Sequence, residues 1–289
     1  GGGAVRLAQL EVSAEKVLYA SPAGSAVVLR DLQPILPGHA LVVPTRPVAR
    51  LGELSQGELS DLVSSAVKAQ ELLQASHGAA AFNWQVKDGP ASGAPVDHVH
   101  LHVVPRTAGD LEANDMVYDL IDRWAPVAGE RAAPPLALEV PPDDARRPRT
   151  VEEMADEARR YSQQMGPEAG ALPKAPVEFG KFKLDPSQVF YASPSGLSLA
   201  FVNLKPIVPG HVLVVPRRVV PKISELTAEE LEDLFAAAQE VTSQVRRFYG
   251  ASSATWGMQD GPVAGQSVPH VHVHVLPQGR GAVDAGASL

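Results

Sequence analysis

Two stretches of alternating histidine and aliphatic residues, HVHLHVV at 98–104 and HVHVHVL at 270–276, decide how this chain is organised. Residues i, i+2 and i+4 of a strand share one face, so each stretch is predicted to project three imidazoles to one side and Val or Leu to the other. The two stretches lie 172 residues apart in a chain of 289. This length and spacing predict two domains.

The sequences that flank the histidines repeat at the same offset of 172 residues, without a gap from about residue 17 to 105. A repeat of this length is a whole domain and not a solenoid unit, so the chain is predicted to be a tandem duplication. The matched segments are VLYASPAG (17–24) with VFYASPSG (189–196), LQPILPGHALVVP (32–44) with LKPIVPGHVLVVP (204–216), and DGPASG (88–93) with DGPVAG (260–265).

Each repeat shows the same order of predicted elements. Runs rich in β-branched residues and closed by Pro or Pro-Gly predict strands, and a helix follows them. The helix starts at a capping-box pattern, S/T-x-x-E, and stops at a glycine. These patterns predict an α+β fold, with a mainly antiparallel sheet and one long helix in each domain. The helix signals are Ser55 to Glu58 with Gly78, and Thr227 to Glu230 with Gly250.

We expect the domain boundaries to follow the changes in composition. Residues 1–124 form the first predicted domain and residues 179–289 the second. Between them, residues 125–178 are Pro-rich and predict a linker, interrupted by a helix at 151–165. The segment 107–124 belongs to the first repeat and has no counterpart after Gln278.

Charge and composition exclude several classes of partner. The net charge is −8, without a basic run, so we expect neither nucleic acid nor a membrane surface as partner. The chain has no Cys, which excludes disulfides, thiolate metal sites and a cysteine nucleophile. No apolar stretch is long enough to span a bilayer. We expect a cytoplasmic protein, or an organellar one if a targeting segment has been removed before Gly1.

Three interpretations of the histidines compete on chemistry alone. They could be the polar face of a half-buried strand. They could hold a metal ion, since three imidazoles bind zinc with one position open. They could also supply a nucleophile and a proton donor for phosphoryl chemistry, because a neutral imidazole is nucleophilic and an imidazolium can donate a proton. His39 and His211 each follow a Pro-Gly turn and could bring a fourth imidazole to each cluster.

The pattern H-φ-H-φ-H-φ-φ, with φ an aliphatic residue, resembles the signature of the histidine triad (HIT) superfamily. Within that superfamily, the segments quoted below are similar to the fragile histidine triad group of dinucleoside polyphosphate hydrolases. Superfamily members with uridylyltransferase or phosphorylase chemistry carry Gln in place of the third His, so the resemblance implies a hydrolase. Two copies of such domains pair across an extended sheet, which implies that this chain folds as an intrachain pseudo-dimer. The segments are 203–216, 258–277, 105–120 and 152–161.

The resemblance also implies roles for individual residues. His272, and by offset His100, would attack the α-phosphorus and form a nucleotidyl-histidine that water hydrolyses. The first and last histidines, His270 and His274 or His98 and His102, would orient the nucleophile and donate to phosphate or leaving-group oxygens. The implied nucleotide-binding residues of the second repeat are Asn203 for the ribose, His211, and Gln259, Gly265, Gln266, Ser267 and Val268 for the phosphates.

The first repeat departs from this pattern at four positions. Asp31 replaces Asn203 and could still bind ribose hydroxyls, Lys87 replaces Gln259, and His39 corresponds to His211. Ala94 and Pro95 replace Gln266 and Ser267, which removes an amide side chain and a backbone N–H from the phosphate turn. We therefore expect the second repeat to be catalytic and the first to be degenerate.

The predicted ligand is a small nucleotide, such as diadenosine triphosphate, cleaved to AMP plus a nucleotide. We expect no cofactor bound by the protein itself, and Mg²⁺ or Mn²⁺ would accompany the substrate phosphates. A second hypothesis stays open: a structural or nucleotide-sensing subunit of a larger assembly, with vestigial sites. In that case a protein partner would hold the termini and the Pro-rich linkers.

Overall fold

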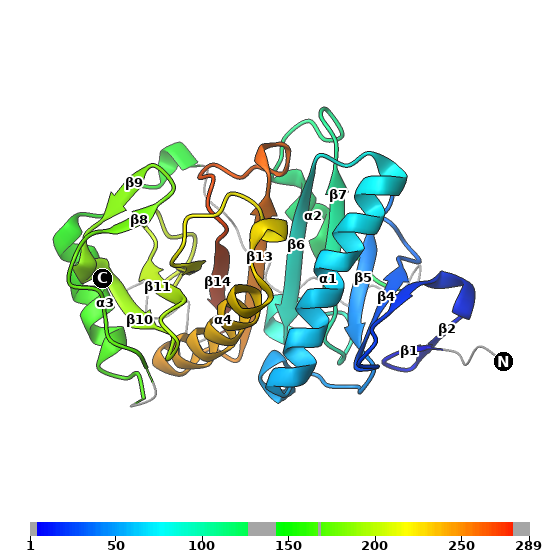
Figure 1. Cartoon of the computed structure of the whole chain (residues 1–289), viewed down its shortest axis with the longest axis horizontal. Coiled ribbons are helices and arrows are strands. Elements are labelled where there is room, and N and C mark those ends of the chain that lie inside the picture. The colour runs from blue at the N-terminus through cyan, green and yellow to red at the C-terminus, as the bar shows by residue number, and fades with distance from the viewer. Residues whose placement is uncertain (1–4, 127–142, 167–168, 280–289) are drawn as a thin grey trace. The chain divides into compact units, whose positions relative to one another are not determined.

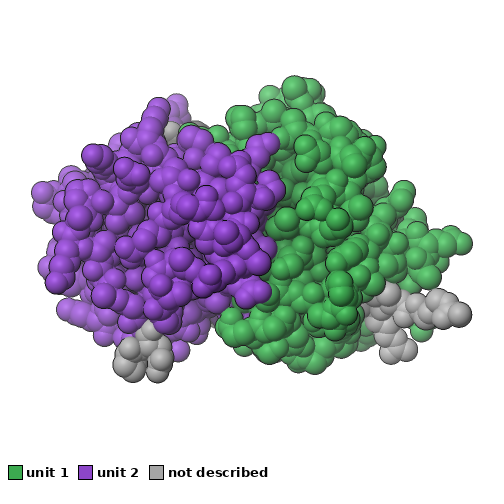
Figure 2. Space-filling view, in the orientation of Figure 1, with its two compact units in different colours: residues 1–137, 257–267 green, residues 138–256, 268–289 purple. Residues whose placement is uncertain are grey.

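The computed structural model describes residues 5–126, 143–166 and 169–279 (Figure 1). The chain divides into two compact units (Figure 2). The first unit contains residues 1–137 and 257–267, and the second contains residues 138–256 and 268–289. Residues 257–267 thus belong to the second repeat in sequence but to the first unit in structure.

The first unit is built on an antiparallel sheet with the strand order β6-β7-β5-β4-β3. A short hairpin of two strands, β1 and β2, lies outside this sheet. The strands are β1 Val5–Leu7, β2 Leu10–Val12, β3 Val17–Ala20, β4 Ala26–Arg30, β5 Ala40–Pro44, β6 Ala81–Asp88 and β7 Leu101–Arg106.

Helix α1 (Gln56–His77) packs on one face of this sheet, against β4, β5 and β7. Its capping box is formed by Ser55 and Glu58, and it ends at Gly78 in the left-handed conformation, as predicted. The unit has one further α-helix among its described residues, α2 (Met116–Asp122). Its short 3-10 helices are η1 Ala14–Lys16, η2 Leu51–Glu53, η3 Pro90–Ser92 and η7 Pro262–Ala264.

The second unit repeats this plan. Its sheet has the order β10-β11-β12-β14-β13, and β13 passes into the first unit after Trp256. Helix α4 packs against β11, β12 and β14, and α3 packs against β10 and β11. The elements are η4 Asp143–Ala145, α3 Val151–Ser162, β8 Val177–Phe179, β9 Phe182–Leu184, η5 Pro186–Gln188, β10 Val189–Ala192, β11 Ser198–Val202, β12 Val212–Pro216, η6 Ile223–Glu225, α4 Ala228–Tyr249, β13 Ser253–Asp260 and β14 Val273–Gln278.

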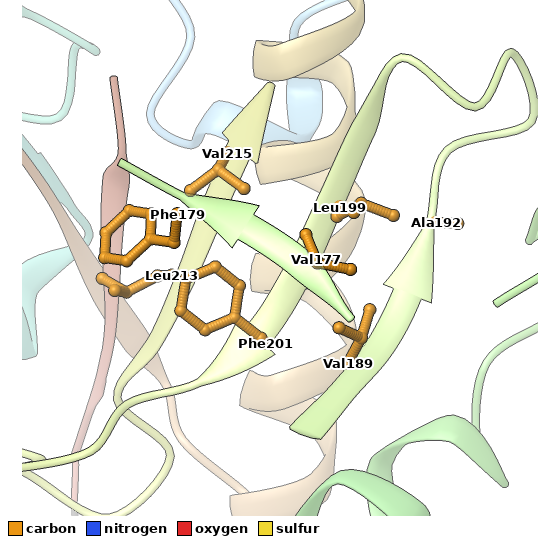
Figure 3. Packing of buried hydrophobic residues seen from close by; sticks show 8 residues of the cluster. All are labelled: Val177, Phe179, Val189, Ala192, Leu199, Phe201, Leu213 and Val215. Carbon is orange, nitrogen blue, oxygen red and sulfur yellow. The ribbon is translucent and has the colours of Figure 1, made fainter. Parts of the chain in front are cut away.

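A small hydrophobic cluster covers the sheet face that carries the histidines. In the second unit β8 lays Val177 and Phe179 over Leu213 of β12 (Figure 3). Leu213 is the direct partner of His274 in the antiparallel register, so both side chains project from the same face of the sheet. In the first unit Leu41 and His102 form the equivalent pair.

The predicted α+β class and the mainly antiparallel sheets with long helices are confirmed. The hairpins β1–β2 and β8–β9 were not predicted. The helix expected at 151–165 is α3, which ends at Ser162. Most of the first Pro-rich linker falls at 127–142, outside the described residues. The domain boundaries and the pseudo-dimer stay predictions.

Candidate active site

The three histidines of each stretch lie at the start of a strand. Strand β14 begins at Val273 and β7 begins at Leu101, so only His274 and His102 lie within a strand. The first two histidines of each stretch precede the strand and turn toward different partners. The rings nevertheless lie close together: His272 and His274 are 5.0 Å apart between ring centroids, and His270 and His272 each lie 5.4 Å from Phe179. The common face of the three imidazoles stays a prediction.

The first histidine of each stretch is fastened to backbone at both ring nitrogens. His270 Nδ1 accepts from the N–H of Gly180 at 3.3 Å, and its Nε2 lies 2.8 Å from the carbonyl oxygen of Pro216. In the first unit, His98 makes the same contacts with Ala8 at 2.8 Å and Pro44 at 2.9 Å. This geometry leaves the first histidine an anchoring role and no ring N–H for a substrate oxygen.

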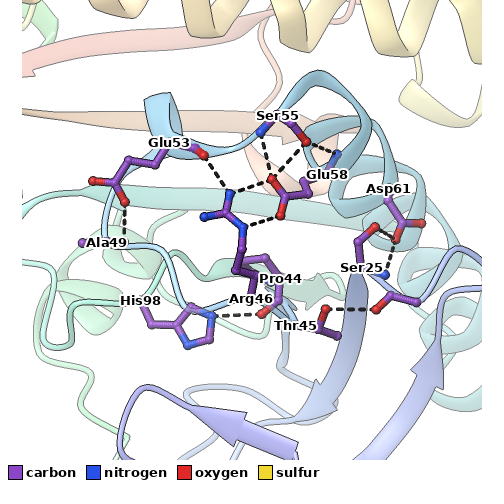
Figure 4. A network of polar contacts seen from close by, with 11 residues as sticks. Ser25, Pro44, Thr45, Arg46, Ala49, Glu53, Ser55, Glu58, Asp61 and His98 are labelled. Carbon is purple, nitrogen blue, oxygen red and sulfur yellow. Dashed lines mark hydrogen bonds and ion pairs between the residues drawn. The ribbon is translucent and has the colours of Figure 1, made fainter.

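The carbonyl that receives His98 belongs to a well-braced strand end (Figure 4). Arg46, two residues beyond Pro44, makes a bidentate ion pair with Glu58 at 2.6 and 2.7 Å. The same guanidinium donates to the carbonyl of Glu53 at 2.8 Å. The strand end is thereby tied to the start of α1. Arg218, Glu230 and Glu225 repeat this arrangement in the second unit.

The middle histidine is oriented as a nucleophile. His272 Nδ1 lies 2.7 Å from the carbonyl oxygen of His270, an acceptor, so the ring proton is on Nδ1 and the lone pair is on Nε2. Burial lowers the pKa of His272 to about 4, so the imidazole is neutral at pH 7. His100 makes the same bond to His98 at 2.7 Å, and burial lowers its pKa to about 4 as well.

The last histidine of the second unit is the end of a hydrogen-bonded relay. The N–H of Ile207 donates to His211 Nδ1 at 3.1 Å, so the proton of His211 is on Nε2. That Nε2 lies 2.9 Å from His274 Nδ1, which places the proton of His274 on its own Nε2. Burial lowers the pKa of both rings, to about 3 for His211. The donor is thus a neutral N–H and not the expected imidazolium.

Asn203 lies beside this relay but does not extend it, because its Nδ2 and the Nε2 of His211 both carry protons. Its Nδ2 lies 3.3 Å from His211 Nε2, and its Oδ1 accepts from the N–H of Lys205 at 2.9 Å. Arg149 donates from its Nε to the carbonyl oxygen of Asn203 at 3.0 Å. The structure therefore places His211 beside His274 and Asn203 beside His211, and their nucleotide-binding roles stay predictions.

The predicted phosphate turn lies in the first unit. Gln259 donates from Nε2 to the hydroxyl of Tyr118, and Gln266 Oε1 accepts from the N–H of Gly261 at 3.0 Å. Gly265 is left-handed, with φ of 93°. Ser267 is exposed, whereas Val268 belongs to the second unit and packs on the cluster of Figure 3. A joint phosphate site with His272 stays a prediction.

The first unit holds its predicted ribose residue in a different environment. Asp31 Oδ1 accepts from the indole N–H of Trp124 at 3.1 Å, and Asp31 Oδ2 lies 3.4 Å from His39 Nδ1. Burial raises the pKa of Asp31 to about 6. His39 Nε2 lies 3.0 Å from His102 Nδ1. Burial lowers the pKa of His39 to about 3 and that of His102 well below its usual value.

The residues that could bind a metal ion are not the three histidines of the triad. Within the described part of the chain, the one cluster of three potential ligands is Asp31, His39 and His102, whose donor atoms lie within 4.8 Å of one another. Two of these groups are hydrogen-bonded to each other and the third accepts from Trp124. Because His98 bonds to backbone at both nitrogens, the triad does not form the three-imidazole metal site considered from the sequence.

Sequence reasoning missed three side chains that shape these sites. Between ring centroids, Trp124 lies 5.3 Å from His100 and 4.8 Å from His102, and Phe179 lies 5.4 Å from both His270 and His272. Tyr118 receives the hydrogen bond of Gln259. Trp124 and Tyr118 belong to the segment 107–124, which lies outside the part of the first repeat that the offset of 172 aligns.

Comparison with known proteins identifies similar domains in both repeats. A family model described as the HIT domain matches residues 11–109 and 183–281. The chain is 56% identical over 103 residues to the bifunctional bis(5′-adenosyl)-triphosphatase/adenylylsulfatase of Arabidopsis thaliana, covering 36% of this chain and 56% of that protein. It is 53% identical over 107 residues to the asymmetrical bis(5′-nucleosyl)-tetraphosphatase of Schizosaccharomyces pombe, covering 37% of this chain and 57% of the relative.

The chain spans about half the length of these two curated relatives. Among solved structures, a GalT-like protein from Arabidopsis thaliana aligns over 93% of this chain and 81% of its own, with a TM-score of 0.52 and 13% identity. At that identity the likeness concerns the fold alone. Among the described residues, no helix is both long and apolar enough to cross a membrane.

Proposed function

Since this chain belongs to the HIT domain family, with one copy of the domain in each half, we propose that it hydrolyses dinucleoside polyphosphates such as diadenosine triphosphate. The relatives described above carry names for this chemistry, as a triphosphatase and a tetraphosphatase. The third histidine of each stretch also favours a hydrolase over a nucleotidyltransferase that carries Gln there.

One observation carries the proposal: the hydrogen bonds of the second unit give its two inner histidines complementary protons. His272 presents a lone pair at Nε2, while His274 presents an N–H at Nε2. The rings lie 5.0 Å apart between centroids. A neutral nucleophile beside a hydrogen-bond donor is what attack on a phosphate ester requires.

The reaction then has two steps. His272 Nε2 attacks the α-phosphorus, a P–N bond forms, and the P–O bond to the leaving nucleotide breaks. The N–H of His274 donates to a phosphate oxygen and stabilises the charge that develops. Water hydrolyses the nucleotidyl-histidine in the second step and returns the lone pair to His272. The products of diadenosine triphosphate are AMP and ADP.

The remaining roles follow from the resemblance and support the same proposal. Asn203 would bind the ribose hydroxyls, and Gln259 with the turn at 265–268 would bind the phosphates. Mg²⁺ or Mn²⁺ would arrive with the substrate as its counterion. His270 would act by holding the backbone carbonyl to which His272 donates.

The test is turnover of diadenosine triphosphate by the purified chain, with AMP and ADP separated by chromatography. We expect His272→Ala to lower the rate by about three orders of magnitude or more, because the nucleophile is lost. His100→Ala is the matched control and should change the rate by less than about twofold. A larger loss in His100→Ala would show that the first unit is the active one.

The same assay separates this proposal from the alternative of a structural or sensing subunit. A subunit that only senses nucleotide would bind diadenosine triphosphate without releasing AMP, and a structural subunit would do neither. Absence of turnover in the unmodified chain at saturating substrate would therefore reject the hydrolase.

A further inference from the structure

Trp124 packs beside three histidines of the first unit. Its indole centroid lies 4.8 Å from the ring of His102, 5.3 Å from that of His100 and 6.5 Å from that of His39. The residue is 6% exposed. It packs in one hydrophobic cluster with Leu7, Val12, Val27, Leu29, Leu41 and Val43.

Asp31 and Lys87, two polar residues that distinguish the first repeat, both bond to the short segment that contains Trp124. Asp31, which replaces Asn203, accepts from the indole N–H of Trp124 at 3.1 Å. Lys87, which replaces Gln259, pairs through Nζ with Asp122 Oδ1 at 2.5 Å. The side chain of Lys87 is 3% exposed. Asp122 and Trp124, two positions apart in the chain, thus bind both of the replaced residues.

The Nε2 atom of His100, which would be the nucleophile of the first unit, is therefore closed to substrate. The Nε2 atoms of His100 and His102 are buried and have no hydrogen-bond partner among the described residues. A phosphorus atom attacked by His100 must approach to ~3–3.5 Å from Nε2. Solvent does not reach His100 Nε2, so a phosphorus atom cannot come this close unless Trp124 moves.

The second unit differs at the same place. The aromatic neighbour of His272 is Phe179, which corresponds to Leu7 in the first unit. His274 is partly exposed, whereas His102 is 1% exposed.

We propose that Asp122 and Trp124 are a built-in occupant of the first nucleotide site, which closes it to nucleotides. The indole replaces the bound nucleoside on Asp31, and the Asp122 carboxylate replaces a phosphate on Lys87. This inference rests on the proposed function, since it takes the first histidine cluster to be a nucleotide site. It deepens that function by leaving the second site as the one open to substrate.

The test counts AMP bound per chain by titration calorimetry. We expect one AMP for the unmodified chain and two for Trp124→Ala, which opens the space and frees Asp31. Trp124→Phe is the matched control: it keeps an aromatic side chain in place, so the count should stay at one. Two AMP molecules in the unmodified chain, or one in a folded Trp124→Ala, would overturn the proposal.

Failure of the proposed function is measured separately, in the turnover assay. A chain that binds nucleotide without cleaving diadenosine triphosphate still binds AMP, so the number of AMP molecules per chain tests the closed first site on its own. Trp124→Ala removes a buried ring, so a second measurement uses the unmodified chain. Diethylpyrocarbonate is expected to modify His100 more slowly than His272 by about tenfold or more, read by peptide mass spectrometry. Equal rates would show that the first site is open.

Discussion

At the scale of single residues, the position of one proton separates the histidines of each triad. In the first two histidines a backbone carbonyl fixes which ring nitrogen carries the proton. The carbonyl of Pro216 does so for His270, and that of His270 does so for His272. A backbone N–H fixes it for the third, through His211. Burial keeps all of these rings neutral by lowering their pKa values, so the rings differ in tautomer and not in charge.

The ionised form of Asp31 lowers the stability of the folded chain, because the carboxylate is buried. Its pKa is raised to about 6, so between pH 3.8 and 6 the folded chain binds more protons than the unfolded one. The free energy of unfolding therefore falls as pH rises through this window. Asp31→Asn removes the charge and should stabilise the first unit by about 2–3 kcal/mol at pH 7.5, with the gain disappearing toward pH 4.

Urea denaturation followed by tryptophan fluorescence at pH 7.5, 5 and 4 measures this difference. Asn203→Asp is the control, since it places a carboxyl at the equivalent position of the second unit, and it should give no stabilisation at pH 7.5. A gain for Asp31→Asn that is the same at all three pH values would contradict a cost that arises from ionisation.

At the scale of elements, the small hairpins matter because their turns anchor the first histidine. Ala8, between β1 and β2, has a φ of 52°, and Gly180, between β8 and β9, has a φ of 57°. Each donates its backbone N–H to the histidine ring, His98 or His270. An alanine in this conformation is strained, so the first repeat keeps the contact at a cost in stability.

Ala8→Gly should relieve this strain and stabilise the first unit by about 0.5–1 kcal/mol, the left-handed cost less the extra chain entropy of glycine. Gly180→Ala should destabilise the second unit by more than about 1 kcal/mol. Its new Cβ would lie 2.6 Å from Val268 Cγ1. Urea midpoints of the two variants measure both effects, and a destabilising Ala8→Gly would show that the turn is not strained.

The elements also show how far sequence reasoning reaches. The helix ends were predictable, because capping at Ser55 and Gly78 depends on residues within one turn of the chain. The hairpins β1–β2 and β8–β9 were not, because strands of three residues are too short to show a period-2 alternation. Nor was the role of Trp124, since its bond to Asp31 joins residues 93 positions apart.

At the scale of the whole molecule, duplication has given two copies of one histidine arrangement with different surroundings. His98 and His270 accept hydrogen bonds from equivalent backbone N–H groups. The ion pairs at the strand ends are also present in both units. The candidate site residues of the second repeat could be named from the family resemblance, and the offset of 172 carries them onto the first repeat. The assignment of residues 257–267 to the first unit could not, because it depends on contacts between distant segments such as Asn83 with Ala264.

The duplication and the resemblance predict that the two halves dock as a pseudo-dimer. One docked body of 289 residues should have a radius of gyration of about 20 Å by small-angle X-ray scattering, whereas halves tethered by free linkers should give roughly 25 Å or more. Insertion of a Gly/Ser stretch of ~20 residues between residues 135 and 136 is the control. The insertion should barely change the radius if the halves are docked, because their mutual contacts and not the linker set the distance between them. A clear increase on lengthening the linker would show instead that the two halves move independently, and the duplicated domains would then have to act as separate bodies.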